Sequence, residues 1–307
     1  MAGIDLNRTT SGIRLDPAQS AEIWSAADET SAVLQLAQRV ALPGAGVSVD
    51  IITGEPEAAW VAETNEKPVS RPTISSKLMT PYTAAVIVPF SNQFKRDKAA
   101  LYNEIVRKLP QALARKLDST VFGTTAPGSN FDVLGGATAV GIGGNTYAGL
   151  VAADQAVAAG GGMLNGWALS PQARGLLLGA TDLNGRPLFI NSAQTDGAVP
   201  ALLGAPTYQT KAVYKAGSPA QVGFVGDWTS AHVGVVEDVS ISISDQATIT
   251  DGDETINLWQ RNMFAVRAEF EVGFRVRDAA HFARLTTTDQ PFPDRGGSTG
   301  GTGGAEG

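Results

Sequence analysis

The chain has 307 residues, of which 43% are hydrophobic and 17% charged, and its formal net charge is −7. It contains no cysteine, which excludes disulfides, thiolate nucleophiles and cysteine–zinc sites and fits a cytosolic protein. The acidic balance argues against a general nucleic-acid binder. No apolar run approaches the roughly 20 residues that span a bilayer, and the N-terminus has no apolar signal segment.

The low charge content is the least ordinary feature of the composition. An average globular chain has about 25% charged residues, whereas this chain has 17% and is rich in glycine. A surface poor in charge suits a protein that is covered by partners. A coding bias toward glycine, alanine and threonine would give the same value, so both interpretations stay open.

Residues 1–45 are predicted to form an N-terminal arm. Residues 1–20 are polar and lack periodicity, whereas residues 21–40 place apolar side chains at near-helical intervals and predict a short helix. Pro43 and Gly44 end this helix.

Residues 46–80 are predicted to form a long β-hairpin. Val47, Val49 and Ile51 alternate with polar residues, and a second strand-like stretch ends at residues 84–88. The polar stretch between them contains three prolines and a single large apolar residue, Trp60. Two extended arms around such a tip indicate a hairpin that projects from the body. A long surface loop is the alternative.

Residues 97–122 contain the clearest helix. Apolar residues recur there every four positions, and charged residues occupy the other faces. Pro110 lies in its interior and is expected to bend it. The stripe that we assign to the core of the subunit consists of Leu101, Ile105, Leu109, Leu113 and Leu117.

The middle of the chain indicates a compact α/β unit. Residues 123–147 form a Gly/Thr-rich connector, and an alanine-rich helix follows at 148–160. Residues 166–170 (GWALS) predict a short buried strand, after which Ser170 caps a helix with Pro171 as its first residue. A turn is predicted at Asn184-Gly185.

The last third of the chain is rich in strands. Seven apolar residues alternate with other residues over 264–276, which predicts a long strand with one buried face and one wet face. Val239, Ile241 and Ile243 alternate with serines in a second strand. Residues 289–307 are predicted to form a flexible tail.

The sequence offers no convincing catalytic, cofactor or metal site. His232 and His281 are the only histidines, and neither has a second ligand at metal-binding spacing. Neither a nucleophile elbow nor a P-loop is present. The glycine-rich stretch 135–145 follows no good strand, and residues 251–254 are better explained as a solvated acidic turn than as a calcium loop. We therefore expect no catalytic residue, no cofactor and no metal.

The order of these parts resembles the major capsid proteins of tailed bacteriophages, which have the Hong Kong 97 fold. That fold is α+β, with an N-terminal arm, an extended hairpin, a spine helix and two further domains. The resemblance covers about residues 20–288 and rests on the order and spacing of several short phrases. These are AAWVAE (58–63), VPFSNQFKRD (88–97), GWALSPQARGLLLGATDLNGRPLF (166–189), LLGAPTY (202–208) and VGDWTSAHVGV (225–235).

The resemblance implies a domain organisation and a set of contacts between subunits. The implied parts are an N-terminal arm (1–45), an E-loop hairpin (46–80), a P-domain (81–144) that contains the spine helix (97–122), an A-domain (145–235), return strands of the P-domain (236–288) and the tail (289–307). Trp60 and Val61 of the E-loop would rest on a neighbouring subunit, and charged residues would pair across that boundary. The expected E-loop contacts are Trp60, Val61, Glu63, Lys67 and Arg71.

The resemblance also implies a function and partners. The chain would assemble with itself into pentamers and hexamers of an icosahedral shell that encloses double-stranded DNA without binding it sequence-specifically. Expected further partners are a separate scaffolding protein, a portal and a decoration protein, with assembly in the host cytoplasm and no membrane. An encapsulin shell protein is the nearest alternative. A soluble α/β enzyme and a tail-tube or decoration protein are weaker ones.

Overall fold

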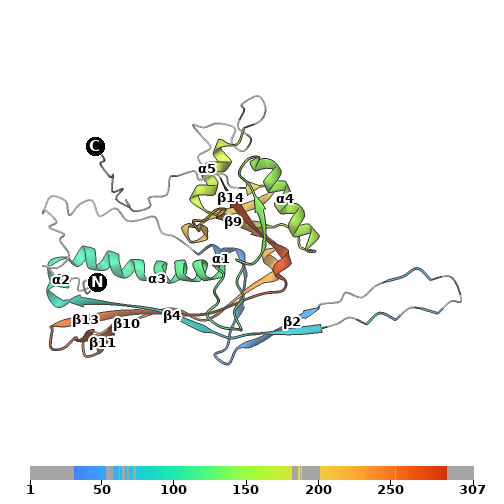
Figure 1. Ribbon diagram of the computed structural model, residues 1–307. Coiled ribbons are helices and arrows are strands. Elements are labelled where there is room, and N and C mark those ends of the chain that lie inside the picture. The colour runs from blue at the N-terminus through green and yellow to red at the C-terminus, as the bar shows by residue number, and fades with distance from the viewer. Residues whose placement is uncertain are drawn as a thin grey trace, which may run out of the picture.

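The computed structural model describes residues 31–52, 58–61, 63, 66–67, 69–71, 74–181, 186, 188, 201–252 and 254–288. Most of the predicted arm, the turn at Asn184-Gly185 and the tail at 289–307 lie outside these residues. Figure 1 shows a lower lobe with a long helix over a sheet, an upper lobe with shorter helices, and a hairpin that extends away from both.

The lower lobe is built on a four-stranded sheet. β1 pairs in parallel with β10, and the other neighbours are antiparallel. Helix α2 (Asn92–Asp97) begins after Ser91, whose side chain accepts a hydrogen bond from the Phe94 amide. Helix α3 (Ala99–Val121) follows and lies along one face of the sheet (Figure 1). The strand order is β1 (Gln38–Ala41), β10 (Ala231–Ser244), β13 (Met263–Val276) and β4 (Tyr82–Ser91).

The long strand predicted at 264–276 is confirmed as β13, but its second face is not uniformly wet. The seven alternating apolar residues are all buried. On the opposite face Ala265 is buried beneath the small hairpin of β11 (Thr248–Asp251) and β12 (Glu254–Asn257), and Gly273 is covered by Met79. The alternation of residues within one strand cannot predict this burial, because segments distant in the sequence cover the second face.

Helix α3 packs its apolar stripe against this sheet. Leu109, Leu113 and Leu117 are buried in the main hydrophobic core, whereas Leu101 and Ile105 are half-buried. Pro110 lies inside α3, which is one helix from Ala99 to Val121. The stripe therefore meets the sheet most closely along the C-terminal half of the helix.

The helix predicted over residues 21–40 can be compared with the structure only from Ser31 onward, and there it ends early. Helix α1 covers only Ala32–Leu36, and β1 follows directly at Gln38–Ala41. Residues Gln38 to Ala41 pair in parallel with His232 to Val235 of β10. This pairing gives the backbone groups partners in the sheet, and so tertiary structure overrides the local helical periodicity. The prediction for 38–41 was wrong for this reason.

The upper lobe is a six-stranded sheet with two helices, α4 (Thr146–Ala159) and α5 (Pro171–Gly179). Both helices pack on the same face of the sheet, because their buried side chains belong to one hydrophobic cluster with side chains of the strands. The buried strand and the cap by Ser170 are confirmed, and the Ala173 amide donates to the Ser170 hydroxyl at 3.1 Å. The strand order is β5 (Thr138–Gly141), β14 (Phe282–Thr287), β9 (Ala220–Gly226), β6 (Gly166–Leu169), β8 (Ala205–Gln209) and β7 (Ala201–Leu202).

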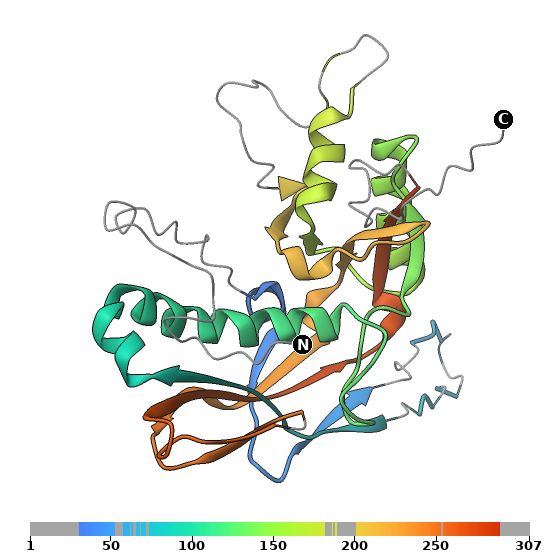
Figure 2. The ribbon, with the colours of Figure 1, turned by 60° about the vertical axis from the view of Figure 1, so that its left-hand side comes forward.

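This sheet draws strands from distant parts of the chain. The predicted Gly/Thr-rich connector at 123–147 contains β5, which pairs in parallel with β14 and was not predicted from the sequence. Both strands lie outside residues 145–235, the range assigned from the sequence to this unit. The last described strand, β14, thus returns from the lower lobe into the upper sheet, where it lies between β5 and β9 (Figure 2).

Aromatic side chains join the two lobes. Phe122, just after α3, stacks on Phe224 of β9 with ring centroids 5.1 Å apart, and its ring also meets that of Trp228 edge-on. Trp228 in turn packs edge-on against Phe282 at 5.2 Å. One hydrophobic cluster therefore continues from the face of α3 to the inner face of the upper sheet, which holds the lobes as one body.

Candidate intersubunit surfaces

The projecting hairpin consists of β2 (Val47–Ile52) and β3 (Ile74–Met79). The strands pair antiparallel in one unbroken register, from Val47 opposite Met79 to Ile52 opposite Ile74. In Figure 1 the hairpin leaves the lower lobe and extends away from the rest of the molecule. A two-stranded hairpin is only marginally stable alone in water, so its base must be held by the body.

Met79 provides the apolar part of that attachment. Its side chain is fully buried against Gly234 of β10 and Gly273 of β13, which lie opposite each other in the sheet. A Cβ atom on Gly234 would lie 2.6 Å from the Met79 sulfur, and one on Gly273 would lie 2.7 Å from its Cγ. The two glycines therefore leave the space that Met79 fills. Glycine inside a long strand is the sequence signal for such a close approach, and our sequence analysis did not use it.

Charged side chains provide the polar part. The Arg275 Nε donates to the Leu78 carbonyl at 2.8 Å, and its Nη1 lies 2.8 Å from an Asp132 carboxylate oxygen. The Lys77 ammonium donates to the Val276 carbonyl at 2.9 Å. The Arg275 side chain is only 11% exposed, so this pairing is shielded from water and fixes β3 on β13.

Among residues 58–71 of the hairpin, every described side chain except that of Val61 is exposed. Trp60 is fully exposed, with a relative exposure of 105%. Val61 is half-buried, and the charged residues that sequence analysis assigned to the boundary, Glu63, Lys67 and Arg71, are exposed. An exposed tryptophan is the kind of side chain that anchors a protein interface.

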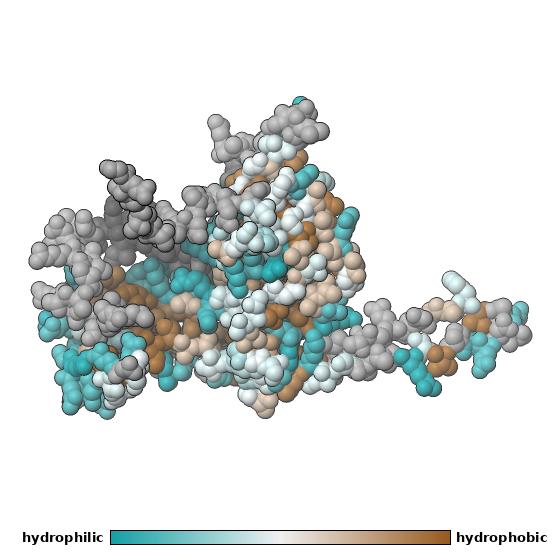
Figure 3. All heavy atoms as spheres, in the orientation of Figure 1, coloured by the Kyte–Doolittle hydropathy of each residue, from teal (hydrophilic) through white to brown (hydrophobic). Residues whose placement is uncertain are grey.

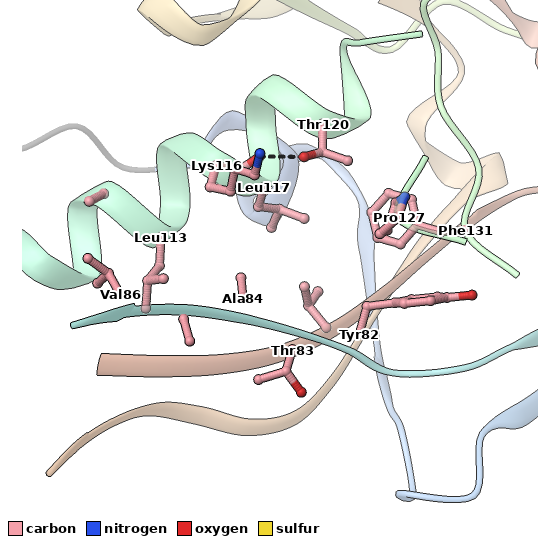
Figure 4. A pocket seen from close by; sticks show the side chains of 13 residues that line it. Tyr82, Thr83, Ala84, Val86, Leu113, Lys116, Leu117, Thr120, Pro127 and Phe131 are labelled. Carbon is pink, nitrogen blue, oxygen red and sulfur yellow. Dashed lines mark hydrogen bonds between the residues drawn. The ribbon is translucent and has the colours of Figure 1, made fainter. Parts of the chain in front are cut away.

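A second apolar surface lies between α3 and the edge strand β4. The groove there has a volume of about 500 Å³. Figure 4 shows Leu113 and Leu117 of α3 pointing toward Ala84 and Val86 of β4, with Lys116 at the rim. Figure 3 shows hydrophobic side chains gathered along the same side of the lower lobe. Apolar surface that the subunit leaves open is typical of an interaction site.

The histidine and acidic side chains of the described residues do not gather into a metal-binding cluster, since no group of three or more could hold a metal ion. Burial lowers the pKa of His232, and His281 is buried at the start of β14. In this part of the chain no helix is long and apolar enough to cross a membrane.

The spine helix over a sheet, the second α/β lobe and the anchored hairpin together make up a Hong Kong 97-type fold. The chain belongs to the phage capsid family, whose model matches residues 12–287.

Two curated relatives are capsid proteins of mycobacteriophages. The chain is 31% identical over 290 residues to the probable major capsid protein gp17 of Mycobacterium phage D29, and the match covers 89% of each chain. It is 31% identical over 309 residues to the protein of the same name in Mycobacterium phage L5, covering 90% of each. Both relatives match nearly end to end, so the similarity is not confined to one lobe.

Solved structures share the fold. A chain from Mycobacterium phage Bobi superposes with a TM-score of 0.74 at 24% identity, covering 92% of this chain and 99% of that one. A capsid chain of a native GTA particle gives a TM-score of 0.66 at 17% identity, covering 91% and 97%. These likenesses extend the fold assignment to both lobes and the hairpin together.

Proposed function

We propose that this major capsid protein assembles into pentamers and hexamers of an icosahedral shell that encloses double-stranded DNA, with each hairpin lying across a neighbouring subunit. The observation that carries this proposal is the contrast within one hairpin. Its base is buried through Met79 and held by Arg275, whereas Trp60 is fully exposed. An arm that is fixed at one end and exposed at the other is suited to reach a second molecule.

Head-to-tail contacts support closed rings. When the same arm of each subunit lies on the next, the contact is heterologous and generates a ring if the rotation closes. Rings of five and six subunits together close a shell. The open groove beside α3 and the low charge content of the chain are compatible with further coverage by neighbours.

The tip of the hairpin divides into an apolar anchor and a charged rim. Trp60 and Val61 would be covered by the neighbouring subunit, and Glu63, Lys67 and Arg71 would pair with charges across the boundary. Buried aromatic anchors usually contribute most of the binding free energy, whereas exposed rim charges contribute little. We therefore assign the affinity of the contact to Trp60.

The proposed partners follow from the role as a shell protein. They are further copies of this chain, a scaffolding protein, a portal and a decoration protein, with assembly in the cytoplasm of the host bacterium and no catalytic step. Membership of the phage capsid family supports this role over those of an encapsulin and of a soluble enzyme. Particles that contain cargo enzyme in place of DNA would favour the encapsulin.

The decisive test removes the tip and keeps the attached base. Residues 55–72 are replaced by a short Gly-Ser turn that joins β2 to β3. We expect the isolated subunit to keep its circular dichroism spectrum, because Met79 and Arg275 remain in place. Shell formation, followed by sedimentation, should be lost or the shells should dissociate at lower temperature.

Two point variants separate the anchor from the rim. Trp60→Ala should weaken assembly by about 2 kcal/mol per contact, and Glu66→Ala, an exposed charge on the same segment, should change it little. Normal assembly of the loop-deleted chain, into shells as heat-resistant as those of the parent, would contradict the proposed contact.

A further inference from the structure

The distal part of β10 is an open strand edge in the described part of the chain. Pairing with β1 ends at Val235, whose carbonyl accepts a last hydrogen bond from the Leu42 amide at 3.3 Å. Beyond this point β10 is paired only with β13, along residues 240–244. Such an edge presents unpaired N–H and C=O groups and is a template for a further strand.

This edge also leaves apolar side chains exposed. Ile241 and Ile243 lie opposite Ala268 and Val266, both of which are buried beneath α3. Directly opposite residues share a face of a sheet, so the two isoleucines belong to the apolar face. Nevertheless Ile241 is 46% and Ile243 is 59% exposed. The apolar face of the sheet therefore extends further than α3 covers it.

A hydrogen bond supports this assignment of faces. The Arg267 Nε donates to the Ser242 hydroxyl at 3.2 Å, which places Ser242 on the face away from α3. Its neighbours Ile241 and Ile243 must then point to the α3 side, because successive side chains of a strand alternate. A strand that completes this edge needs apolar residues at every second position and polar residues between them.

The N-terminal segment of the chain enters on this side of the sheet. Ser31 donates to the Asp118 carboxylate of α3, and the Ala32 amide donates to the other carboxylate oxygen at 3.0 Å. After α1 the chain continues into β1, the neighbour of β10 at the edge opposite β4 (Figure 2). The chain that precedes the described residues therefore joins them at Ser31, next to Asp118, and Asp118 does not line the groove at β4.

Two stretches of that segment have the required pattern. Residues 3–7 (GIDLN) and 12–16 (GIRLD) each place two apolar side chains at alternate positions. Ile241 is paired with Ala268, which is paired in turn with Val86 on the other side. Val86 lines the groove together with Leu113. Along the axis of α3, Asp118 lies roughly 8 Å from Leu113, which is at the level of Ile241. Residues 17–30 can span about 45 Å when extended, which is enough to cover this distance.

We propose that residues 12–16 add to the free edge of β10 as a further strand of the same subunit. Ile13 and Leu15 would cover Ile241 and Ile243, while Arg14 and Asp16 would face solvent. Residues 12–16 are favoured over residues 3–7 because they close a shorter loop to Ser31, which costs less chain entropy. The N-terminal arm would thereby complete the sheet of its own subunit.

Hydrogen exchange on the full-length, unassembled chain tests this pairing. In Ile13→Ser/Leu15→Ser we expect the amides of residues 239–244 to exchange about tenfold faster or more, because the added strand no longer covers them. The matched control Ile4→Ser/Leu6→Ser should leave them unchanged. Exchange along the central strand β13 should be the same in all three proteins. Equal exchange of 239–244 in the parent and in the first variant would overturn the proposal.

Engineered disulfides test whether the strand comes from the same subunit. Because the chain has no cysteine, Leu15→Cys can be combined with Ile241→Cys or with Ile243→Cys and then oxidised. A disulfide within one chain in at least one of the two pairs supports the proposal. Disulfides only between chains would assign the edge to a second copy, and no disulfide in either pair would remove the contact. Both of these outcomes would contradict the proposal.

Discussion

Asp118 is a buried carboxylate in the middle of the molecule. It is 1% exposed and accepts hydrogen bonds from the Ser31 hydroxyl and from the Ala32 and Val33 amides at the start of α1. These bonds tie the N-terminal segment to α3 across more than eighty residues of sequence. Burial raises the pKa of Asp118, and the hydrogen bonds oppose that effect in part. From the sequence, Asp118 was one of the charged residues on the faces away from the leucine row, and only that row was assigned to the core.

The raised pKa of Asp118 predicts a pH dependence of stability. A carboxyl group with a higher pKa in the folded state binds its proton more tightly there. Its contribution is therefore fully present below the ordinary pKa of 3.8 and is lost as the pH rises through the folded-state value. In Asp118→Asn this dependence disappears. We expect the difference in unfolding free energy between parent and variant to shrink as the pH rises, as measured by denaturant unfolding. A difference that grows with pH would contradict the prediction.

Leu113 and Lys116 offer a matched pair on α3. Leu113 is 3% exposed in the main core, whereas Lys116 lies at the rim of the groove. Leu113→Ala should lower the unfolding free energy by about 2–5 kcal/mol, because it removes buried methyl groups and leaves a cavity. Lys116→Ala should cost less than about 0.5 kcal/mol. Thermal and denaturant unfolding of the isolated subunit measure both, and equal small losses would show that the stripe is assigned to the wrong face.

At the scale of elements, the joint between β3 and β13 decides where the hairpin points. Met79 fits over two glycines, and Arg275 joins the backbone of β3 to the Asp132 carboxylate. The strand pattern of 264–276 predicted β13 but not this joint. Its contacts link residues almost 200 positions apart, so no local periodicity reports them.

Gly273→Ala tests the joint. The new Cβ would lie 2.7 Å from Met79 Cγ and 2.9 Å from the Thr80 carbonyl oxygen. We expect a loss of about 1–3 kcal/mol in unfolding free energy from overpacking and faster proteolysis of the hairpin. Gly141→Ala is the control, because nothing lies within 4 Å of its Cβ position. It should shift stability by no more than about 0.5 kcal/mol, and equal effects of the two changes would refute the packing argument.

In the whole molecule, β14 is the last element of the described residues. This strand lies between β5 and β9 inside the six-stranded sheet and ends at Thr287. Truncation after Gln290 removes a stretch rich in glycine with no apolar periodicity and leaves every described strand intact. We expect the truncated chain to unfold at the same temperature and to assemble normally by sedimentation and negative-stain microscopy. An assembly defect with unchanged thermal unfolding would identify the tail as a contact between subunits.

The two lobes share one core although they are separate in sequence. The cluster around Phe122, Phe224 and Trp228 joins α3 to the upper sheet. In the sequence β5 precedes residues 145–235 and β14 follows them, yet both strands belong to that sheet. A division into contiguous ranges therefore describes the order of the parts along the chain, whereas the sheets combine segments from several ranges.

The long elements and the family could be predicted from the amino-acid sequence alone. The leucine row of α3, the alternation in β13 and the Ser170-Pro171 helix start all depend on neighbours within a few residues. The ordered phrases along the chain were enough to indicate a phage capsid protein. The charged and apolar residues assigned to the hairpin tip concern contacts with another subunit, and these assignments stay predictions.

The pairing of the shorter strands and the packing between elements became known only from the three-dimensional structure. Residues 38–41 and 138–141 became strands because β10 and β14 offered them edges. Met79 needed two glycines from strands far along the chain. Ile241 was left exposed because α3 packs over β13 and β4 and because β1 ends before reaching it. Strand pairing and burial depend on residues that are distant in the sequence, so they could not be predicted from local patterns. Helical or strand periodicity and helix capping depend on neighbouring residues, so they could be predicted.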